Sequence, residues 1–250
     1  MPKKTAIVLA AGKGTRMKSD LPKVLFPVCG RPMLEYVLDA LNKGGVDRTI
    51  LVVGYRHDLV RETLDGRDGI EYALQAEQLG TGHAVMVCRE LIADETGPVL
   101  VVTGDAPMMQ SDTIRELLEE YDRGQPACIL GTVRKDNPHG LGRIVRDSAG
   151  RFAAIVEEKD ASEEQRQIQE VNMSCYVFHA PDLIRSLGRL RADNAQREYY
   201  ITDVPGMLAA EGREVRALCV LKPCEAMGIN TVAELADVEA AMRQMVAGTS

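Results

Sequence analysis

The sequence predicts an α/β fold, a Rossmann-like, mostly parallel mixed sheet with helices on both faces. Short apolar runs alternate along the chain with segments whose apolar residues recur at helical spacing, an alternation typical of parallel sheets. Several runs are apolar at nearly every position, as expected of strands that are covered on both faces. The length of 250 residues, 45% of them apolar and 27% charged, suits one large domain or a domain with a small lobe.

In the first half of the chain we expect strands over residues 5–11, 49–53, 70–74 and 99–103. Between the first two, apolar residues from Leu34 to Leu41 recur at helical spacing, with Pro32 near the start and Gly44 at the end. The same spacing predicts helices over 84–92 and 114–121, the second of them capped by Ser111. Each predicted helix leads from one strand to the next.

The second half of the chain has a more mixed pattern. A hairpin is expected over 142–157, with "SAG" at its turn, and further strands over 171–178 and 215–221. Helices are expected over 181–190, 201–211 and 231–246. Because no hexapeptide repeat is present, we expect no β-helix domain in this chain.

Several classes of protein do not fit the composition. No apolar run approaches the ~20 residues needed to cross a bilayer. The run "TAIVLAA" is followed by "GKGTRMK" and not by a small-residue cleavage site, so we interpret it as a buried strand and expect a cytoplasmic protein. The six cysteines form no C-x-x-C pair and fit mostly core positions in a reducing compartment; they are residues 29, 88, 128, 175, 219 and 224.

The net charge of −7 conceals an asymmetry between the two ends of the chain. Residues 1–31 carry seven lysines and arginines against Asp20 alone, and the remainder is strongly acidic. An acidic protein with a basic head is a poor general binder of nucleic acid. A local positive cleft instead favours a small polyanionic ligand.

A glycine-rich, basic loop follows the first predicted strand, in "LAAGKGTRM" (9–17). Met17 stands where a dinucleotide-binding fingerprint has its third glycine, and the loop does not fit a P-loop either. Gly12 and Gly14 would let backbone N–H groups approach anionic oxygens, and Arg16 and Lys23 would supply positive charge. On the loop alone, a flexible solvated turn explains the pattern equally well.

The position of the loop favours the phosphate-binding interpretation. Ligands of open parallel sheets bind beyond the carboxyl ends of the strands. Three segments rich in glycine, amide, cation or carboxylate follow such strands, namely "AAGKGTR" (10–16), "QAEQLGTGHA" (75–84) and "TGDAP" (103–107). We therefore expect them to surround one crevice.

Two polar residues in these segments have both ordinary and functional interpretations. Asp105 would serve as a turn or capping residue, or as an oxygen ligand for Mg²⁺. Gln75 would be an ordinary surface amide, or would pair with the edge of a nucleobase through its adjacent donor and acceptor. That pairing suits an imide of uracil, thymine or guanine. With the amide flipped it also suits cytosine, so Gln75 alone does not name the base.

These motifs resemble the signature of the sugar-1-phosphate nucleotidyltransferases. The resemblance is closest to the N-terminal pyrophosphorylase domain of the bifunctional N-acetylglucosamine-1-phosphate uridyltransferases. It spans residues 6 to about 235, through "LPKVL", "LQAEQLGTGHA", "GDAP", "GRI", "IVEEKDA", "QIQEVN", "EYYITD" and "GIN". It implies the nucleotide-diphospho-sugar transferase fold, with a nucleotidyltransferase domain over 1–230, a hairpin and sugar-binding lobe at about 135–200, and a C-terminal helix and tail over 231–250.

The resemblance also implies a reaction and its ligands. A uridylyl group would pass from UTP to N-acetylglucosamine 1-phosphate, giving UDP-N-acetylglucosamine and pyrophosphate, with Mg²⁺ as cofactor. The attacking phosphate is already an anion, so positioning and charge neutralisation suffice and no catalytic base is needed. We accordingly interpret His83 as structural. No nucleic-acid, membrane or protein partner is inferred.

Residue roles follow from the matched motifs. The catalytic residues would be Arg16, Lys23 and Asp105. The nucleotide would be held by Ala10, Ala11, Gly12, Gly14, Lys23, Gln75, Gly80, Thr81 and Gly104. The sugar would contact Gly142, Glu157 and Asn172, and the metal would bind Asp105 and Asn230.

The sequence departs from the family pattern near the expected sugar pocket. Thr103 stands where the family usually has tyrosine, and Met173 and Ser174 follow Asn172 where the family usually has Thr-Gly. Another sugar 1-phosphate, or another triphosphate such as dTTP or GTP, is therefore the alternative within the same reaction. A non-catalytic nucleotide-sugar-binding module is the alternative of another class, and the retained Lys23 and Asp105 count against it.

Overall fold

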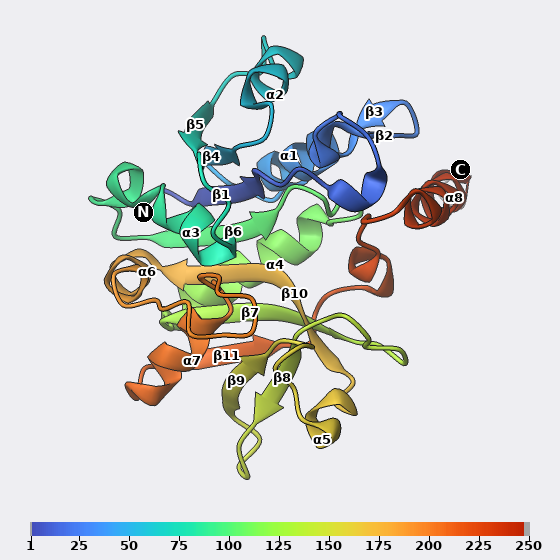
Figure 1. The fold of residues 1–250 in the computed structure, drawn as a ribbon. Coiled ribbons are helices and arrows are strands. Elements are labelled where there is room, and N and C mark those ends of the chain that lie inside the picture. Colours follow the sequence, from blue (N-terminus) through green and yellow to red (C-terminus); the bar gives the residue numbers. More distant parts are fainter. Residues whose placement is uncertain (1, 248–250) are drawn as a thin grey trace.

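The computed structural model describes residues 2–247 and has one large mixed sheet (Figure 1). Its main path runs in the order β11-β7-β10-β6-β1-β4-β5. The bounds of these strands are β1 Thr5–Ala10, β4 Arg48–Val53, β5 Ile70–Leu74, β6 Pro98–Thr103, β7 Cys128–Arg134, β10 Glu170–His179 and β11 Val215–Leu218. Neighbours on this path pair in parallel, except that β10 is antiparallel to both β6 and β7. The predicted fold class, a mostly parallel mixed sheet, is confirmed.

Two smaller strand pairs lie outside this main strand order. The hairpin β8 (Arg143–Arg146) and β9 (Phe152–Val156) joins the start of β10, where Val171 pairs with Arg143. A separate short hairpin is formed by β2 (Pro27–Val28) and β3 (Arg31–Pro32). The first of these was predicted from the "SAG" turn, and the second was not.

Helices cover both faces of the sheet (Figure 1). The helices are α1 Met33–Lys43, α2 His57–Thr63, α3 Thr81–Met86, α4 Ser111–Gly124, α5 Glu163–Arg166, α6 Ala180–Leu187, α7 Asp203–Ala210 and α8 Val232–Ala247. Short 3₁₀ turns lie at η1 Thr15–Met17, η2 Lys23–Leu25, η3 Arg89–Ile92 and η4 Pro223–Ala226. No helix within residues 2–247 is long and apolar enough to cross a membrane.

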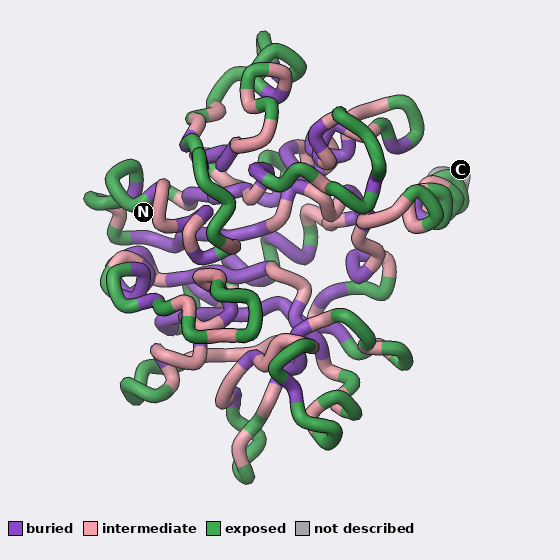
Figure 2. The backbone as a smooth tube through the Cα atoms, viewed as in Figure 1, coloured by how far each residue is buried: buried purple, intermediate pink, exposed green. Residues whose placement is uncertain are grey.

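The side-chain alternation of the strands supplies a core to each face. In β1, Ala6 and Val8 pack into the cluster that contains the apolar faces of α1 and α4. Ile7 packs into the opposite cluster with residues of α3, α6 and α7. Buried positions therefore follow the central strands, and exposed ones follow the connecting loops (Figure 2).

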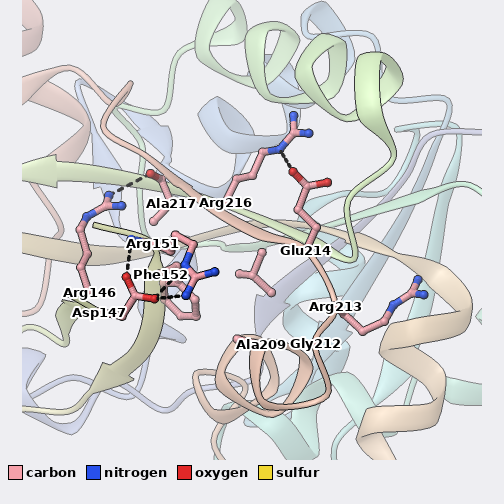
Figure 3. A pocket seen from close by; sticks show the side chains of 11 residues that line it. Arg146, Asp147, Arg151, Phe152, Ala209, Gly212, Arg213, Glu214, Arg216 and Ala217 are labelled. Carbon is pink, nitrogen blue, oxygen red and sulfur yellow. Dashed lines mark hydrogen bonds and ion pairs between the residues drawn. The ribbon is translucent and has the colours of Figure 1, made fainter. Parts of the chain in front are cut away.

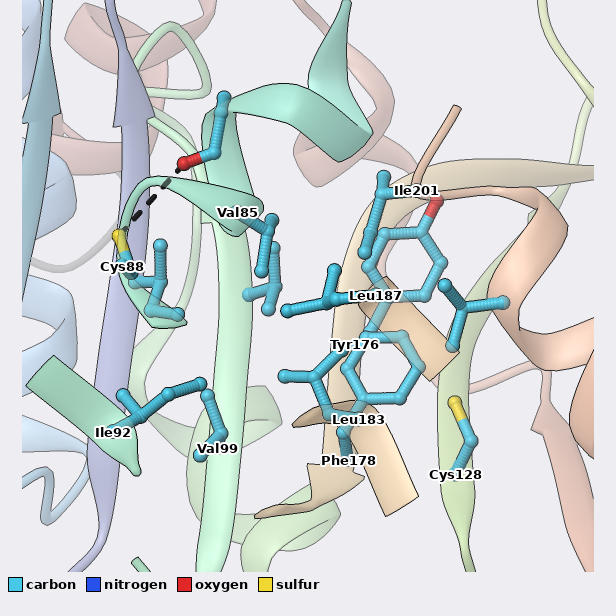
Figure 4. Close-up of a cluster of buried hydrophobic side chains, with 14 of the residues drawn as sticks. Val85, Cys88, Ile92, Val99, Cys128, Tyr176, Phe178, Leu183, Leu187 and Ile201 are labelled. Carbon is cyan, nitrogen blue, oxygen red and sulfur yellow. Dashed lines mark hydrogen bonds between the residues drawn. The ribbon is translucent and has the colours of Figure 1, made fainter. Parts of the chain in front are cut away.

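The hydrophobic cluster on the face covered by α3, α6 and α7 shows how the antiparallel strand β10 is held (Figure 4). Tyr176 and Phe178 of β10 stack with their ring centroids 5.5 Å apart, and both side chains are fully buried. Cys88 and Cys128 are buried in the same cluster, as expected of core cysteines. Cys175 is also buried, whereas the cysteines at 29 and 219 are exposed, so the cysteine prediction holds for only part of the set.

Several element boundaries differ from the sequence predictions. The helix expected over 84–92 is divided into α3 and η3, because the intervening Cys88 N–H bonds to the carbonyl of Val85, three residues back. The strand expected over 215–221 ends at Leu218. Strand β7 and helices α2 and α5 were not predicted at all. The last residues of the predicted tail, 248–250, lie outside the described part.

The predicted Ser111 cap of α4 is wrong. Ser111 is the first residue of the helix, and no side chain of the preceding Gln110 caps it. The buried carboxylate of Glu225 performs this role from a distant segment, since it accepts the backbone N–H of Gln110 at 2.9 Å and the hydroxyl of Thr113 at 2.7 Å. The helix start is thus capped through tertiary structure.

Candidate active site

A crevice of about 430 Å³ opens beyond the carboxyl ends of β1, β5 and β6. The three segments expected at this rim all line it. Its lining includes nearly all of the predicted nucleotide and catalytic residues, namely Ala10, Ala11, Gly12, Gly14, Arg16, Lys23, Gln75, Gly80, Thr81 and Asp105. Gly104 is not among the lining residues, and its backbone N–H bonds instead to the carbonyl of Leu9 at 2.9 Å.

The loop after β1 depends on a glycine at position 14. Gly14 has a φ of +68°, a left-handed conformation that residues with a side chain rarely adopt. A Cβ atom built there would lie 2.6 Å from the Cβ of Lys23. The glycine therefore lets the loop turn while the start of η2 packs against it, which brings Lys23 to the rim.

Four polar side chains form one network at this rim. The ammonium group of Lys23 donates to the carboxylate of Asp105, and to Oδ1 of Asn230 at 2.8 Å. Arg16 donates to the same Oδ1 atom, also at 2.8 Å. Residues more than 200 positions apart in the sequence thus meet at one point, as the predicted roles of Arg16, Lys23, Asp105 and Asn230 require.

Asn230 is held at the network by the start of α8. The carboxylate of Glu234 accepts the backbone N–H of Asn230 at 2.7 Å, and the hydroxyl of Thr231 accepts the N–H of Glu234 at 3.2 Å. This reciprocal arrangement satisfies the free N–H groups of the helix end. One turn further along α8, Val238 packs in a cluster with Met17 of the basic loop.

The end of the crevice beside β5 is built around Gln75. Its backbone continues the parallel pairing of β5 with β4, through an N–H bond to Val53 at 2.8 Å. Its side-chain Nε2 donates to the carbonyl of Gly80 at 3.1 Å and lies 3.2 Å from Nδ1 of His83. Gln78 donates to the carbonyl of Ala11 at 2.7 Å and thereby joins this segment to the end of β1.

The three predicted sugar-binding residues form a second cluster. Gly142 and Glu157 flank the first register pair of the β8–β9 hairpin, and the carbonyl of Gly142 accepts the N–H of Asn172 at 2.9 Å. The side-chain amide of Asn172 donates to the hydroxyl of Tyr176 at 2.7 Å. Burial raises the pKa of Glu157, and a hydrogen bond from Thr202 opposes that shift.

The polar network around Lys23 and the second cluster of Gly142, Glu157 and Asn172 lie at the same rim of the sheet. Because β10 is antiparallel to β6, with Tyr176 opposite Val101, Asn172 is carried toward the end of β6 where Asp105 follows. The segment before α7 also reaches both groups of side chains, since Glu198 lines the crevice and Thr202 is near enough to Glu157 to lower its pKa. A ligand held in the crevice therefore has polar side chains of the second cluster within its reach.

Comparison with known proteins identifies the family. The model of the MobA-like NTP transferase domain matches residues 6–200. The chain belongs to this family. Two bifunctional GlmU proteins illustrate the similarity: that of Geotalea daltonii is 43% identical over 256 residues, and that of Pelobacter propionicus 44% identical over 242 residues. These matches cover 100% and 96% of the chain but 56% and 52% of the relatives, so the chain spans about half of their length.

Solved structures share the fold of this NTP transferase domain. A UDP-glucose pyrophosphorylase in complex with UDP-glucose superposes with a TM-score of 0.77 at 18% identity, covering 98% of the chain and all of that structure. A Bacillus anthracis structure described as a glucose-1-phosphate thymidylyltransferase has a TM-score of 0.79 at 19% identity, covering 96% and 95% of the two chains. At such identities the likeness establishes the fold alone.

Sequence reasoning missed several residues of the NTP transferase crevice. Gln78 stands within the motif "LQAEQLGTGHA" and Glu198 within "EYYITD", so the motifs held a signal for both of them. Arg143 of "GRI" is almost fully buried and donates to the carboxylate of Glu158 at 2.6 Å and to a carbonyl of α5. It ties the end of β9 to α5 beside Glu157.

A second cavity of the NTP transferase, of about 590 Å³, lies between the β8–β9 hairpin, α7 and β11 (Figure 3). Its arginines at first suggest an anion site. Each of them, however, already pairs with a carboxylate: Arg146 with Glu170, Arg151 with Asp147, Arg213 with Asp182, and Arg216 with Glu214 and Glu120. This cavity therefore offers no cluster of uncompensated positive charge comparable to the crevice.

Proposed function

We propose that this chain transfers a uridylyl group from UTP to N-acetylglucosamine 1-phosphate, giving UDP-N-acetylglucosamine and pyrophosphate. The observation that carries the proposal is the meeting of Arg16, Lys23, Asp105 and Asn230 at the rim of a crevice that also contains Gln75. Membership of the NTP transferase family and about 43% identity to GlmU proteins over the whole chain support it.

The chemistry suits these side chains. An oxygen of the sugar phosphate attacks the α-phosphorus of UTP, the new P–O bond forms in line with the breaking α–β bond, and pyrophosphate leaves with the electron pair. Arg16 and Lys23 hold and neutralise the phosphates while negative charge shifts toward the leaving group. The glycine-rich loop supplies backbone N–H groups that approach the phosphates closely. No residue has to remove a proton, because the attacking phosphate is ionised.

The donor set at Asp105 and Asn230 fits Mg²⁺. A carboxylate and an amide oxygen are hard ligands of the kind this ion takes, with phosphate oxygens and water completing its shell. Both side chains already turn toward a single cation, the ammonium of Lys23. When bound, the metal would supply further neutralisation of the triphosphate. Lys23 would then leave these two oxygens and interact with the phosphates.

The second cluster supports a sugar as the acceptor. Glu157 and Asn172 offer acceptor and donor groups suited to hydroxyls, and Asn172 is nearly buried. The departure from the family motif at Ser174 preserves the backbone, since Ser174 adopts a φ of +52° where the motif has glycine. Its N–H bonds to Oδ1 of Asn172 at 3.2 Å and keeps that amide in place.

A substrate panel tests the proposal. Pyrophosphate release is measured with UTP, dTTP, GTP and CTP, each combined with N-acetylglucosamine 1-phosphate, glucose 1-phosphate or galactose 1-phosphate, in the presence of Mg²⁺. The highest kcat/KM is expected for UTP with N-acetylglucosamine 1-phosphate. Faster turnover of another pair would overturn the substrate assignment. Tight binding of nucleotide-sugar without turnover of any pair would favour the non-catalytic module.

A further inference from the structure

The carboxamide of Gln75 is held by two partners on its nitrogen side. The residue is only 4% exposed, at the wall of the crevice. Its Nε2 donates to the carbonyl of Gly80 at 3.1 Å and contacts Nδ1 of His83 at 3.2 Å. An amide nitrogen carries two N–H groups, so both donors are engaged by the protein itself.

The Gly80 carbonyl can only accept a hydrogen bond, whereas the role of Nδ1 of His83 depends on the tautomer of the ring. The Gly80 carbonyl has no proton, and an imidazole Nδ1 accepts when the ring is neutral with its proton on Nε2. A Gln75 amide turned by 180° would place its oxygen against two acceptors. With His83 in this neutral Nε2–H form, both contacts hold the amide in one orientation.

This orientation leaves the carbonyl oxygen of Gln75 as the group available to a ligand in the crevice. An acceptor at that point complements the imide N–H of uracil or thymine. Cytosine presents a lone pair at the same ring nitrogen, so two acceptors would face each other without a proton between them. An unpaired polar contact of this kind is costly in a site shielded from water.

We propose that His83 is a positioning residue that selects imide-bearing pyrimidine triphosphates over cytidine triphosphate, by fixing the amide of Gln75 with its oxygen toward the base. The inference rests on the proposed function to the extent that a nucleoside triphosphate binds in this crevice. It assigns to His83 a role beyond the structural one expected from its place in "GTGHA". It also removes the ambiguity that Gln75 has when considered alone.

The first test replaces the acceptor in matched variants. His83→Leu removes it, whereas His83→Asn places an amide oxygen close to the position of Nδ1. The ratio of kcat/KM for UTP to that for CTP is expected to fall roughly tenfold in His83→Leu, the effect of losing about one hydrogen bond, and to recover in His83→Asn. His139→Leu, at an exposed histidine, is the control and should keep the wild-type ratio.

The outcomes separate the inference from its alternatives. If His83→Leu lowers kcat/KM equally for UTP and CTP, His83 is merely structural and the inference is overturned. If the wild-type protein itself turns over CTP better than UTP, the proposed uridylyl transfer fails, whatever the variants do. Circular dichroism and thermal unfolding show whether each variant is folded before its ratio is interpreted.

A second test uses the wild-type chain and so does not depend on the folding of a variant. Imidazole ¹⁵N chemical shifts distinguish the two neutral tautomers and the charged form of histidine. The His83 signals, assigned by comparison with His83→Asn, are expected to report the Nε2–H tautomer at neutral pH. An Nδ1–H tautomer would overturn the inference, because it would place a donor against the Gln75 amide nitrogen.

Discussion

The ammonium of Lys23 occupies the point at which two oxygen donors meet. It contacts the carboxylate of Asp105 and the amide oxygen of Asn230, and its own side chain is only 13% exposed. A cation held this way lowers the cost of placing Asp105 in a partly enclosed site. The same two donors are of the kind that fits a divalent metal, so a bound metal would compete with the lysine for them.

Replacing Lys23 should therefore affect turnover more than binding. In Lys23→Ala we expect kcat to fall by roughly 10²–10³, the effect of removing one preorganised transition-state donor. The dissociation constant for UTP, measured by calorimetry, should change much less. Lys18→Ala is the matched control, because Lys18 is exposed and does not line the crevice. A near-normal kcat in Lys23→Ala would show that this lysine does not stabilise the transition state.

For the same substitution we expect an opposite effect on metal binding, which should become stronger while turnover falls. Without the competing ammonium, Asp105 and Asn230 are free to bind a divalent ion, so the affinity for Mg²⁺ in the absence of nucleotide should rise severalfold. Titration with Mn²⁺ followed by electron paramagnetic resonance measures this directly. Asp105→Asn should weaken binding instead. An unchanged affinity in Lys23→Ala would mean that the metal does not use these two oxygens.

The raised pKa of Glu157 predicts a pH dependence of sugar binding. Burial favours the protonated form, so Glu157 gains its proton at a higher pH than an exposed glutamate as the pH falls from neutral. The protonated group accepts hydrogen bonds from sugar hydroxyls less well, and the KM for the sugar phosphate should rise.

The control separates this effect from titration of the substrate. Glu157→Gln cannot titrate, so the ratio of its KM to the wild-type KM should approach a constant below the pKa of Glu157 and increase above it. Stability is linked to the same shift, because the pKa of Glu157 is higher in the folded protein than in the unfolded chain. The free energy of unfolding therefore decreases as the pH rises through the folded pKa and Glu157 ionises. A ratio that does not vary with pH would exclude Glu157 from the sugar site.

The convergence of the following residues on one crevice was predictable from sequence for a physical reason. Ala11 and Gln75 directly follow strands, Asp105 and Gly14 come two and four residues after one, and parallel strands bring such positions to one edge. The contact of Thr202 with Glu157 was not predictable in this way. It depends on how the segment before α7 crosses the β8–β9 hairpin, a long-range arrangement that no local pattern encodes.

At the level of elements, strand β7 shows why a buried strand escaped prediction. Its sequence "CILGTVR" contains Gly131, a residue that weakens strand propensity. The structure requires a small residue there, because a Cβ on Gly131 would lie 2.4 Å from Cδ1 of Leu221 and 3.2 Å from Cδ1 of Leu117. The cause is close packing against Leu221, in the segment between β11 and η4, and against α4, which becomes visible only when the fold is known.

The start of α4 depends on a similar long-range contact. Glu225, which is 5% exposed, accepts the backbone N–H of Gln110, the hydroxyl of Thr113 and the backbone N–H of Lys222. Its carboxylate thus joins η4 to the first turn of α4, where the helix dipole favours negative charge. Sequence reasoning selected the nearest serine because capping is usually local.

Removing this carboxylate should destabilise the fold. In Glu225→Gln one acceptor oxygen becomes an amide nitrogen that faces donors, so we expect the free energy of unfolding to fall by about 1–3 kcal/mol. Urea denaturation measures the change. Glu119→Gln, on the exposed side of α4, is the control and should change the value by less than about 0.5 kcal/mol. Equal effects in both variants would show that Glu225 is not a special contact.

Over the whole molecule, the lysines and arginines of the basic N-terminal segment, residues 1–31, do not form one surface patch. Lys4 pairs with Asp122 at 3.0 Å, and Arg31 pairs with Glu35 and Asp39. Lys13, Arg16 and Lys23 line the crevice, so the positive charge available to a polyanion is concentrated there. The rest of the protein is acidic, and the crevice is therefore a local positive site in a negative field.

This charge distribution predicts a salt dependence that is specific to the phosphates of the ligand. Raising the ionic strength from about 0.1 M to about 1 M shortens the screening length from roughly 10 Å to roughly 3 Å, so the affinity for UTP should fall markedly. Uridine would make the same base contacts without the charge, and its affinity should change little. Calorimetric titration of both ligands across this range measures the difference. Equal salt dependence for UTP and uridine would mean that the three crevice cations do not hold the triphosphate, and that salt acts on the fold rather than on the site.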